Sequence, residues 1–285
     1  MTDRTGSWLD RATQVLAAAG VPSPRNDALL LAVDGAGHSR LELSRIDDPG
    51  PRYWSLLVRR ARREPLQHLV GRAWFRHVDV AVGPGVFVPR PETEVVAGAA
   101  VDEARAIATQ GRAPVVVDLG TGTGVIALSV GHEVPTSVVH AVEVDDDAYQ
   151  WAQRNLSASR VVLHHADLAD VPDVLPDLLG RVHVVVSNPP YIPPDGVPVD
   201  PEVRDHDPAR ALYGAGVDGL GDVRAVVATA NRLLVEGGLV VIEHADTQAA
   251  RVLGLLDGDW LDPADHLDLS GRARYVTARR RPRHP

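Results

Sequence analysis

The sequence predicts an α/β fold in which a mainly parallel sheet carries helices on both faces, preceded by a small helical domain. From residue 92 onward, short apolar runs alternate with longer segments of helical periodicity. This alternation is typical of parallel strands joined by crossover helices. The first seventy or so residues show helical periodicity instead. A hydrophobic content of 45% is ordinary for a globular protein and predicts a packed core.

Three helical stretches predict a separate domain over residues 1–72. They are SWLDRATQVLAAAG, SPRNDALLLAVDGAG and PRYWSLLVRRARREPLQHLVG. In the second stretch, Ser23 is an N-cap candidate and Pro24 takes the first helical position, as is typical of helix starts. Over residues 73–91, apolar residues alternate about a Gly-Pro-Gly sequence, which predicts a β-hairpin linker.

Residues 92–285 are predicted to form the main α/β domain. Continuous apolar runs in this part predict strands that are covered on both faces. The predicted strands are residues 113–120, 136–144, 160–167, 181–188 and 238–244, with a closing pair at 265–270 and 273–279. The predicted helices are residues 93–111, 125–133, 146–158, 219–238 and 247–258.

Composition and charge argue against several classes of protein. The absence of cysteine excludes disulfides, thiolate metal sites and a cysteine nucleophile, and it favours a cytoplasmic location. We find neither a secretory signal nor an apolar stretch of membrane-spanning length. A net charge of −9 argues against a main role in gripping nucleic acid. His164 and His165 are interpreted as strand residues, because no acidic or cysteine ligand stands beside them at metal spacing, and no metal is predicted.

A glycine-rich loop follows the first predicted strand of the main domain. Asp118 ends that strand, and the loop contains Gly120, Gly122 and Gly124. Ligands of open parallel sheets bind at the carboxyl ends of strands, where glycine lets the backbone approach them closely. The spacing differs from the G-x-G-x-x-G fingerprint, which argues against a nicotinamide dehydrogenase. The loop is therefore predicted to bind a ligand, with a purely structural turn as the alternative.

Acidic residues follow the second and third strands of the main domain. Glu143 lies about twenty residues after the glycine loop, where a carboxylate can accept hydrogen bonds from ribose hydroxyls. Asp167 could receive an adenine amino group, with Leu168 packing on the ring, and a solvated loop acid is the alternative. Asp145–Asp147 are predicted to begin the next helix, where negative charge is favourable.

The fourth strand is followed by Asn188, Pro189, Pro190 and Tyr191. A plain turn would use glycine, aspartate or asparagine with one proline. Two prolines followed by an aromatic residue make a stiff platform instead.

The glycine loop, the acids after the second and third strands, and this platform together resemble the class I S-adenosylmethionine-dependent methyltransferases. A subset of that class carries [N/D]-P-P-[Y/F] after the fourth strand and methylates a planar nitrogen, and Asn188–Tyr191 match the motif. All four features in this order are far more specific than any one of them. The resemblance implies a seven-stranded Rossmann-like sheet and S-adenosyl-L-methionine as cofactor.

The residue types of the motif suit the chemistry that this resemblance implies. The lone pair of a planar nitrogen is delocalised, so it must be aimed in line at the methyl carbon. The Asn188 side-chain oxygen and the Pro189 carbonyl can accept the two N–H bonds, while Tyr191 packs on the flat group. Positioning of this kind supplies on the order of 7–11 kcal/mol. We expect no metal, no covalent intermediate and no tuned base.

Over nearly its whole length the chain resembles the release factor glutamine methyltransferase family (HemK-like, PrmC). The segments that carry the resemblance are EPLQHLVG, VPRPETE, DLGTGTGVIAL, SNPPYIP, DPARALYGAGVDGL and GGLVVIEH. VPRPETE is the most telling, since the related ribosomal-protein glutamine methyltransferases usually differ there. The family implies methylation of the side-chain amide nitrogen of the glutamine in the Gly-Gly-Gln loop of bacterial class I peptide chain release factors. The helical domain is then expected to recognise that protein substrate.

The resemblance implies roles for individual residues, which are assigned by matching each motif of this sequence to the corresponding motif of the family. The cofactor is expected at Asp118, Gly120, Thr121, Gly122, Thr123, Gly124, Glu143, Asp167, Leu168 and Asn188. The catalytic residues that hold the glutamine are expected to be Asn188, Pro189, Pro190 and Tyr191, with Arg90 and Glu92 as further substrate contacts. Pro91 and Glu94 would also line the site, with an ordinary helix start at Thr93 as the alternative.

Other functions stay open at this stage. A ribosomal-protein glutamine methyltransferase is the closest alternative. An amino-methyltransferase of nucleic acid would need a target-recognition domain or a base-flipping apparatus, which the short N-terminal domain does not supply. A non-catalytic module that binds the cofactor as a signal would not need Asn188. The sequence also departs from the family at His68, where tyrosine is common, and at Leu168, where some relatives have a bulky aromatic residue.

Overall fold

The computed structural model describes residues 4–282, and the chain divides into two compact units. The first unit comprises the chain up to Arg72 together with Val82–Pro84 and Val197–Asp207. The second comprises Ala73–Ala81, Gly85–Gly196 and the chain from Pro208 onward. Residues 197–207 lie inside the predicted main domain in the sequence, yet they pack with the helices of the first unit.

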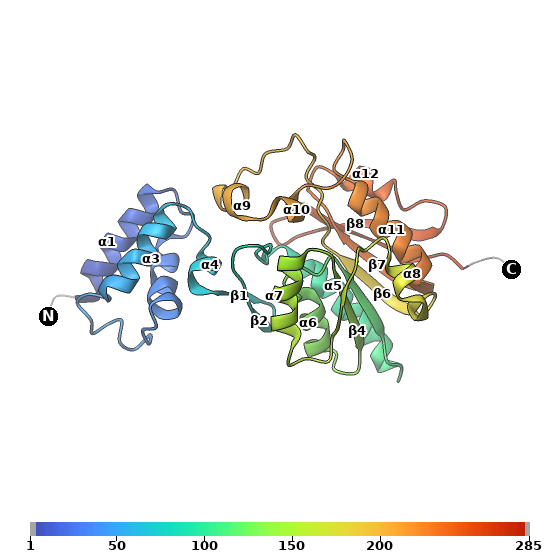
Figure 1. The fold of residues 1–285 in the computed structure, drawn as a ribbon, viewed down its shortest axis with the longest axis horizontal. Helices are drawn as coiled ribbons and strands as arrows, with labels where there is room; N and C mark the ends of the chain where they lie inside the picture. The colour runs from blue at the N-terminus through green and yellow to red at the C-terminus, as the bar shows by residue number, and fades with distance from the viewer. Residues whose placement is uncertain (1–3, 283–285) are drawn as a thin grey trace. The chain divides into compact units, whose positions relative to one another are not determined.

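The first unit is a bundle of short helices around an apolar core (Figure 1). Its helices are α1 (Arg4–Ala18), α2 (Pro24–Leu30), the π-helical turn Leu31–Gly35, α3 (Gly50–Ala61), α4 (Leu66–Val70) and α9 (Pro201–His206). Trp8 and Tyr53 are fully buried and meet edge to face, with ring centroids 5.3 Å apart. Pro24 occupies the first position of α2 as predicted, but the Ser23 side chain makes no capping hydrogen bond.

A buried ion-pair network lies within this helical unit. Arg60 donates from Nε to Asp27 Oδ2 at 2.8 Å and from Nη1 to Glu202 Oε1 at 2.7 Å. Arg63 donates from Nε to the same Glu202 oxygen at 2.7 Å. Burial opposes ionisation of Glu202, but hydrogen bonds from Arg63 and Arg60 outweigh it and hold the pKa of this carboxyl at about 2. Glu202 therefore ties α9 to α3 as a paired, ionised side chain.

We expect Glu202→Ala to lower the free energy of unfolding of the helical unit by about 3 kcal/mol, because it leaves buried Arg60 without one of its two carboxylates. The pKa of Glu202 is depressed by folding. The stabilisation is therefore complete above its ordinary pKa and is lost as the pH falls toward 2. Urea unfolding at pH 7 and at pH 3, followed by tryptophan fluorescence, measures both effects.

Asp205→Ala is the matched control, since Asp205 lies on the same helix in an exposed pair with Arg204. Exposed pairs contribute about 0–1 kcal/mol. Equal losses from the two substitutions would contradict the role given to Glu202.

A two-stranded hairpin consists of β1 (Arg72–Phe75) and β2 (Val78–Ala81). The chain reverses at Arg76 and His77, so the prediction that the hairpin turns at Gly-Pro-Gly is wrong, although Pro84 and Gly85 do form a separate turn after β2. Arg76 adopts the left-handed conformation with φ of 49°, which is uncommon for a residue other than glycine. Its Nε donates to Glu133 Oε1 at 2.7 Å, which holds the turn in place. The alternation after the hairpin reflects burial of Val86 and Val88 rather than strand pairing.

The second unit contains a seven-stranded, mainly parallel sheet, as predicted. Its strands are β3 (Val115–Leu119), β4 (Val138–Glu143), β5 (Val162–His165), β6 (Val182–Ser187), β7 (Leu234–Glu243), β8 (Trp260–Leu267) and β9 (Ala273–Arg280). They are ordered β5-β4-β3-β6-β7-β9-β8. The first five are parallel, and β9 is antiparallel to both β7 and β8. The fully buried run Val184–Val186 lies at the centre of this sheet.

Helices cover both faces of the sheet. They are α5 (Thr93–Thr109), α6 (Val125–Glu133), α7 (Asp146–Leu156), α8 (Val171–Val174), the 3₁₀ turn Pro176–Leu178, α10 (Ala209–Leu212), α11 (Gly221–Leu233) and α12 (Ala249–Leu253). Figure 1 shows α6 and α7 on one side of the sheet and α8 and α11 on the other. Among the described residues, no helix combines the length and apolarity needed to cross a membrane.

Two predicted strand boundaries are wrong. β7 begins at Leu234, inside the predicted helix 219–238, because its pairing with β6 jumps from Leu234 to Leu239 and the residues between bulge out. β8 begins at Trp260 and contains Pro263, which normally argues against a strand. Proline is tolerated there because β8 is the edge strand and its register shifts between Leu261 and Ala264.

Candidate active site

The carboxyl ends of the five parallel strands lie at one edge of the sheet, and the candidate site is built there. These strands end at Leu119, Glu143, His165, Ser187 and Glu243. The glycine loop follows β3 and the Asn-Pro-Pro-Tyr segment follows β6, and β3 and β6 are direct neighbours. The side chain of Ser187 strengthens this pairing by donating a 2.7 Å hydrogen bond to the Leu119 carbonyl.

The three glycines of the loop have different roles. All three have positive φ, with values of 71° at Gly120, 58° at Gly122 and 83° at Gly124. A Cβ atom at Gly124 would lie 3.0 Å from Leu156, so this glycine serves helix packing. At Gly120 and Gly122 a Cβ atom would meet nothing within 4 Å. Gly120 and Gly122 therefore border open space, as a loop that binds a ligand requires. Gly124 instead fits the alternative prediction of a purely structural turn.

Asp118 is fully buried beneath the loop. Its Oδ2 atom accepts hydrogen bonds from Thr121 Oγ1 at 2.5 Å and from the Ala127 amide at 3.1 Å. Its Oδ1 atom has no hydrogen-bond partner among the residues that the structure describes. Burial raises the pKa of Asp118 to about 7, and the charge of Glu143 adds to the rise. A buried carboxylate oxygen without a partner fits a cationic donor group bound at the loop.

Glu143 holds the loop in shape. Its Oε2 atom accepts a 2.8 Å hydrogen bond from the Gly122 amide, and Oε1 accepts from the Val144 and Asp145 amides at 2.8 and 2.9 Å. Oε2 keeps room for one further donor, as the predicted contact with a ribose hydroxyl requires. Asp145 caps α7 by accepting from two backbone amides at 3.1 Å, which confirms the predicted helix start.

Asp167 and Leu168 follow β5 and make local contacts. Asp167 Oδ1 accepts a 2.9 Å hydrogen bond from the Ala169 amide. The Leu168 side chain is buried in the apolar core, and its carbonyl accepts from Thr229 Oγ1 at 3.0 Å. Their contact with adenine stays a prediction. His164 and His165 lie in β5 as predicted, and burial lowers the pKa of His164.

The platform Asn188–Tyr191 packs against the segment around Gly214 and Gly219. The Ile192 amide donates to the Leu212 carbonyl at 2.9 Å, and the Gly214 amide donates to the Ile192 carbonyl at 3.0 Å. A Cβ atom at Gly214 would lie 2.6 Å from the Pro190 carbonyl oxygen, so only glycine fits. In addition, Gln248 Nε2 donates to the Tyr191 carbonyl at 2.8 Å.

Side chains that sequence reasoning did not select as site residues surround Asn188 and Tyr191. Asn188 Nδ2 lies 3.3 Å from Thr93 Oγ1, and Tyr191 Oη lies 3.5 Å from Glu243 Oε1. Burial raises the pKa of Glu243 to about 7, and hydrogen bonds from Thr93 and Tyr191 and the charge of Arg274 act against this rise. Glu243 ends β7, the strand beside β6. Its place after the apolar run GLVVI is the signal that could have revealed it.

The predicted substrate contacts before α5 differ in their surroundings. Arg90 lies over the Phe87 ring, with its Cζ atom 5.1 Å from the centroid. The charge of Glu92 raises the pKa of both Glu243 and Tyr191, so its carboxylate lies within electrostatic range of these two groups. The Glu94 carbonyl accepts a 3.0 Å hydrogen bond from Arg76 Nη1. Thr93 does begin α5, as the alternative interpretation had it, but its side chain also contacts Asn188.

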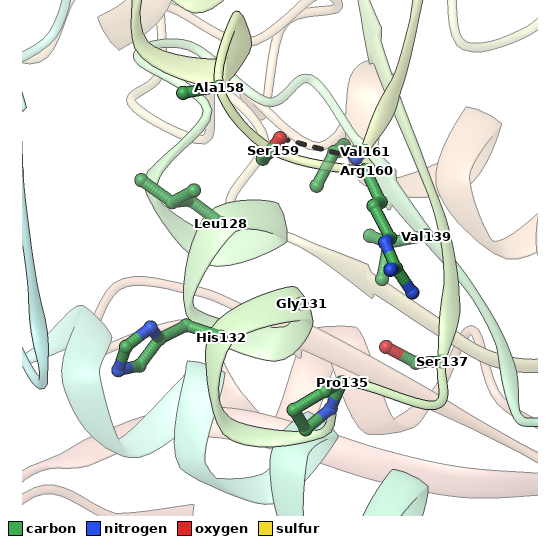
Figure 2. A pocket seen from close by; sticks show the side chains of 10 residues that line it. All are labelled: Leu128, Gly131, His132, Pro135, Ser137, Val139, Ala158, Ser159, Arg160 and Val161. Carbon is green, nitrogen blue, oxygen red and sulfur yellow. Dashed lines mark hydrogen bonds between the residues drawn. The ribbon is translucent and has the colours of Figure 1, made fainter.

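A surface hollow of about 380 Å³ lies elsewhere on the second unit (Figure 2). Its lining residues are Leu128, Gly131, His132, Pro135, Ser137, Val139, Ala158, Ser159, Arg160 and Val161. Several of them precede or begin β4 and β5, so the hollow lies at the amino ends of these strands. The glycine loop and the platform lie at the opposite edge, and the hollow does not belong to the candidate site.

The strand order and the placement of both loops are those of a class I methyltransferase, and comparison with known proteins agrees. Residues 94–198 match the family described as methyltransferase small domain, and residues 7–71 match the PrmC N-terminal domain. Release factor glutamine methyltransferase of Streptomyces coelicolor is 52% identical, over 95% of this chain and 96% of that protein. The protein of the same name from Mycolicibacterium smegmatis is 46% identical, over 97% and 98% of the two chains.

The chain belongs to the release factor glutamine methyltransferase family, and it is an enzyme. The same comparison also finds a similar protein with a different name. The 4-amino-L-phenylalanine/4-methylamino-L-phenylalanine methyltransferase of Streptomyces pristinaespiralis is 39% identical, over 88% of this chain and 87% of that protein.

Proposed function

We propose that the protein transfers a methyl group from S-adenosyl-L-methionine to the side-chain amide nitrogen of the glutamine in the Gly-Gly-Gln loop of bacterial class I peptide chain release factors. One observation carries the proposal. Asn188 and Pro189 follow the strand beside the glycine loop, in a chain that aligns over nearly its full length with release factor glutamine methyltransferases. The helical unit, which matches the PrmC N-terminal domain, is proposed to take part in recognising the protein substrate.

The residues at the glycine loop fit the proposed cofactor. The partnerless Oδ1 of Asp118 can accept from its ammonium group, and Glu143 Oε2 can accept from a ribose hydroxyl. Gly120 and Gly122 leave open space where its chain would approach the backbone. The cofactor supplies an electrophilic methyl group on a sulfonium. The carboxylates of Asp118 and Glu143 complement the positive charge of the cofactor's ammonium group. This complementarity supports binding of the cofactor at the open loop.

The platform is proposed to hold the glutamine amide for an in-line transfer. The Asn188 side-chain oxygen and the Pro189 carbonyl accept the two amide N–H groups, which fixes the nitrogen and favours loss of its planarity. A nitrogen–carbon bond forms, the carbon–sulfur bond breaks with its electron pair going to sulfur, and a proton leaves the methylated nitrogen for solvent. Positioning of the two reactants is the main catalytic resource.

The proposal is tested by offering labelled S-adenosyl-L-methionine with five acceptors in parallel. These are a class I release factor, its loop Gln→Ala variant, a short peptide with the Gly-Gly-Gln sequence, 4-amino-L-phenylalanine and duplex DNA. We expect label on the native factor, none on the variant or the DNA, and weaker labelling of the peptide, which lacks the surface that the helical unit recognises. Label on the amino acid alone would reject the release factor as substrate, since the relative from Streptomyces pristinaespiralis carries that name.

A further inference from the structure

One peptide group at the end of the platform is held at both of its polar ends. The Tyr191 carbonyl accepts a 2.8 Å hydrogen bond from Gln248 Nε2. The N–H of the same peptide group belongs to Ile192, and it donates to the Leu212 carbonyl at 2.9 Å. Together these two hydrogen bonds fix the plane of the Tyr191–Ile192 peptide group against rotation.

The orientation of the Gln248 amide follows from partners that can act in only one way. A backbone N–H only donates, and a backbone carbonyl only accepts. Gln248 Oε1 accepts from the Ala245 amide at 3.1 Å, while Gln248 Nε2 donates to the Tyr191 carbonyl. Gln248 is 4% exposed, so water competes little for these two hydrogen bonds.

Gln248 itself ends a short loop that is tied to the sheet. His244 follows β7 and is fully buried, with its Nδ1 atom 2.8 Å from the Ala245 carbonyl. Its Nε2 atom lies 3.0 Å from Asp265 Oδ1 on β8. The Ala245 carbonyl also accepts from the Gln248 backbone amide at 2.8 Å. The loop is therefore fixed to β8, and the Gln248 side chain connects the platform to it.

The two prolines of the platform make such an external donor useful. Pro189 and Pro190 have no N–H group, so the platform cannot be bonded to the core through amides at these positions. The Pro189 carbonyl is proposed to accept from the substrate, so it does not serve as an anchor either. The Tyr191 carbonyl has no such task. A hydrogen bond to it holds the platform without occupying a group that the reaction uses.

We propose that Gln248 is a positioning residue for methyl transfer, which acts by holding the Tyr191–Ile192 peptide group at the end of the platform. With that group fixed, the Pro189 carbonyl and the Asn188 side chain keep the directions that the acceptor nitrogen requires. The inference rests on the proposed function insofar as these two groups accept from the nitrogen that is methylated. The effect of Gln248 on the rate passes through the backbone of the platform.

Gln248→Glu tests the donated hydrogen bond through its pH dependence. When protonated, the introduced carboxyl can donate to the Tyr191 carbonyl and accept from the Ala245 amide, as the glutamine does. When ionised, it only accepts and faces a carbonyl oxygen. The ratio of its kcat on the release factor to the wild-type kcat is expected to be near one at low pH and to fall by on the order of 10–100-fold as the pH rises. Because burial raises the pKa of the introduced carboxyl above its ordinary value of about 4.3, the fall is expected between about pH 5 and 8.

Gln248→Met keeps the length of the side chain but has no N–H donor. Its kcat is expected to be lowered by a similar factor at every pH. The KM for the release factor and the affinity for the cofactor are expected to change only a few-fold in both variants, because the groups proposed to bind them stay in place. Rates are measured well below the Tm of each variant, so that a loss of stability does not enter.

Gln153→Glu is the matched control, since Gln153 is exposed on α7 and the same substitution there places a carboxyl in water. It is expected to methylate at the wild-type rate at every pH. A pH-independent ratio for Gln248→Glu, or a wild-type kcat for Gln248→Met, would overturn the inference. Inactivity of the wild-type enzyme on the release factor would instead count against the proposed function.

A second readout needs no substrate. The Ile192 amide proton belongs to the peptide group that Gln248 holds, so it is expected to exchange with water faster in Gln248→Met than in the wild-type enzyme. In Gln248→Glu, its exchange is expected to exceed that of the wild-type enzyme at pH 8 and to match it at pH 5. Amide exchange followed by NMR, with each variant compared with the wild-type enzyme at the same pH, measures this difference. Unchanged exchange in Gln248→Met would overturn the inference whichever substrate the enzyme uses.

Discussion

Asn188→Ala is expected to lower kcat for methyl transfer by on the order of 10²–10³, the loss that follows removal of one preorganised hydrogen-bonding group from an active site. The substitution removes one of the two acceptors proposed for the substrate N–H groups and leaves the Pro189 carbonyl. The glycine loop, Asp118 and Glu143 keep their mutual contacts, so cofactor affinity is expected to change only a few-fold. Single-turnover methylation and calorimetric titration with the cofactor measure the two quantities separately.

Asn231→Ala is a matched control for the loss of an asparagine side chain. Asn231 lies in the last turns of α11 and bonds Asp259 and Arg280, away from the carboxyl ends of the parallel strands. This variant is expected to methylate at the wild-type rate. Full activity of Asn188→Ala would contradict the proposed role of the platform in holding the substrate nitrogen.

The features that the sequence predicted well are those encoded in short stretches of chain. Apolar runs predicted the five parallel strands, because a strand that is buried on both faces needs no distant information to be recognised. The closing pair was predicted without such runs, and the bounds of the largely exposed strand β8 were wrong. The glycine loop and Asn188–Tyr191 were visible for the same reason, since each follows such a strand directly. The structure adds details that the spacing of residues in the sequence does not encode, such as the packing of Gly124 against Leu156.

The features that the sequence did not predict depend on contacts between distant residues. Thr93 and Asn188 are separated by 95 residues, and Tyr191 and Glu243 by 52. No local pattern marks such pairs. Likewise, α9 joins the helical unit because Glu202 meets Arg60 and Arg63, which lie about 140 residues earlier. The hairpin turn was misplaced because a left-handed arginine held by an ion pair looks like an ordinary strand residue in sequence.

Gly219→Ala is expected to lower kcat by on the order of tenfold to a hundredfold, because the added Cβ atom displaces the backbone of the platform. Gly219 is buried with φ of 71°, and a Cβ atom there would lie 2.7 Å from both the Tyr191 carbonyl oxygen and the Pro193 nitrogen. Both neighbours are backbone atoms in or just after the platform that is proposed to hold the substrate, and they cannot turn aside as a flexible side chain could. The methylation rate under single-turnover conditions measures the displacement, and cofactor affinity is expected to stay near the wild-type value.

Gly216→Ala separates this contact from the cost of the left-handed backbone. Gly216 has φ of 83°, but it is exposed, and the nearest atom to its added Cβ would be Asp218 Oδ1 at an ordinary 3.5 Å. Both substitutions carry the penalty of about 1–2 kcal/mol for a left-handed alanine, and only Gly219→Ala adds overpacking of about 1–3 kcal/mol. A larger drop in Tm together with slower methylation for Gly219→Ala alone is therefore expected. Equal rates for the two variants would mean that the segment behind Tyr191 does not control the position of the substrate, and that the prolines alone hold the platform in place.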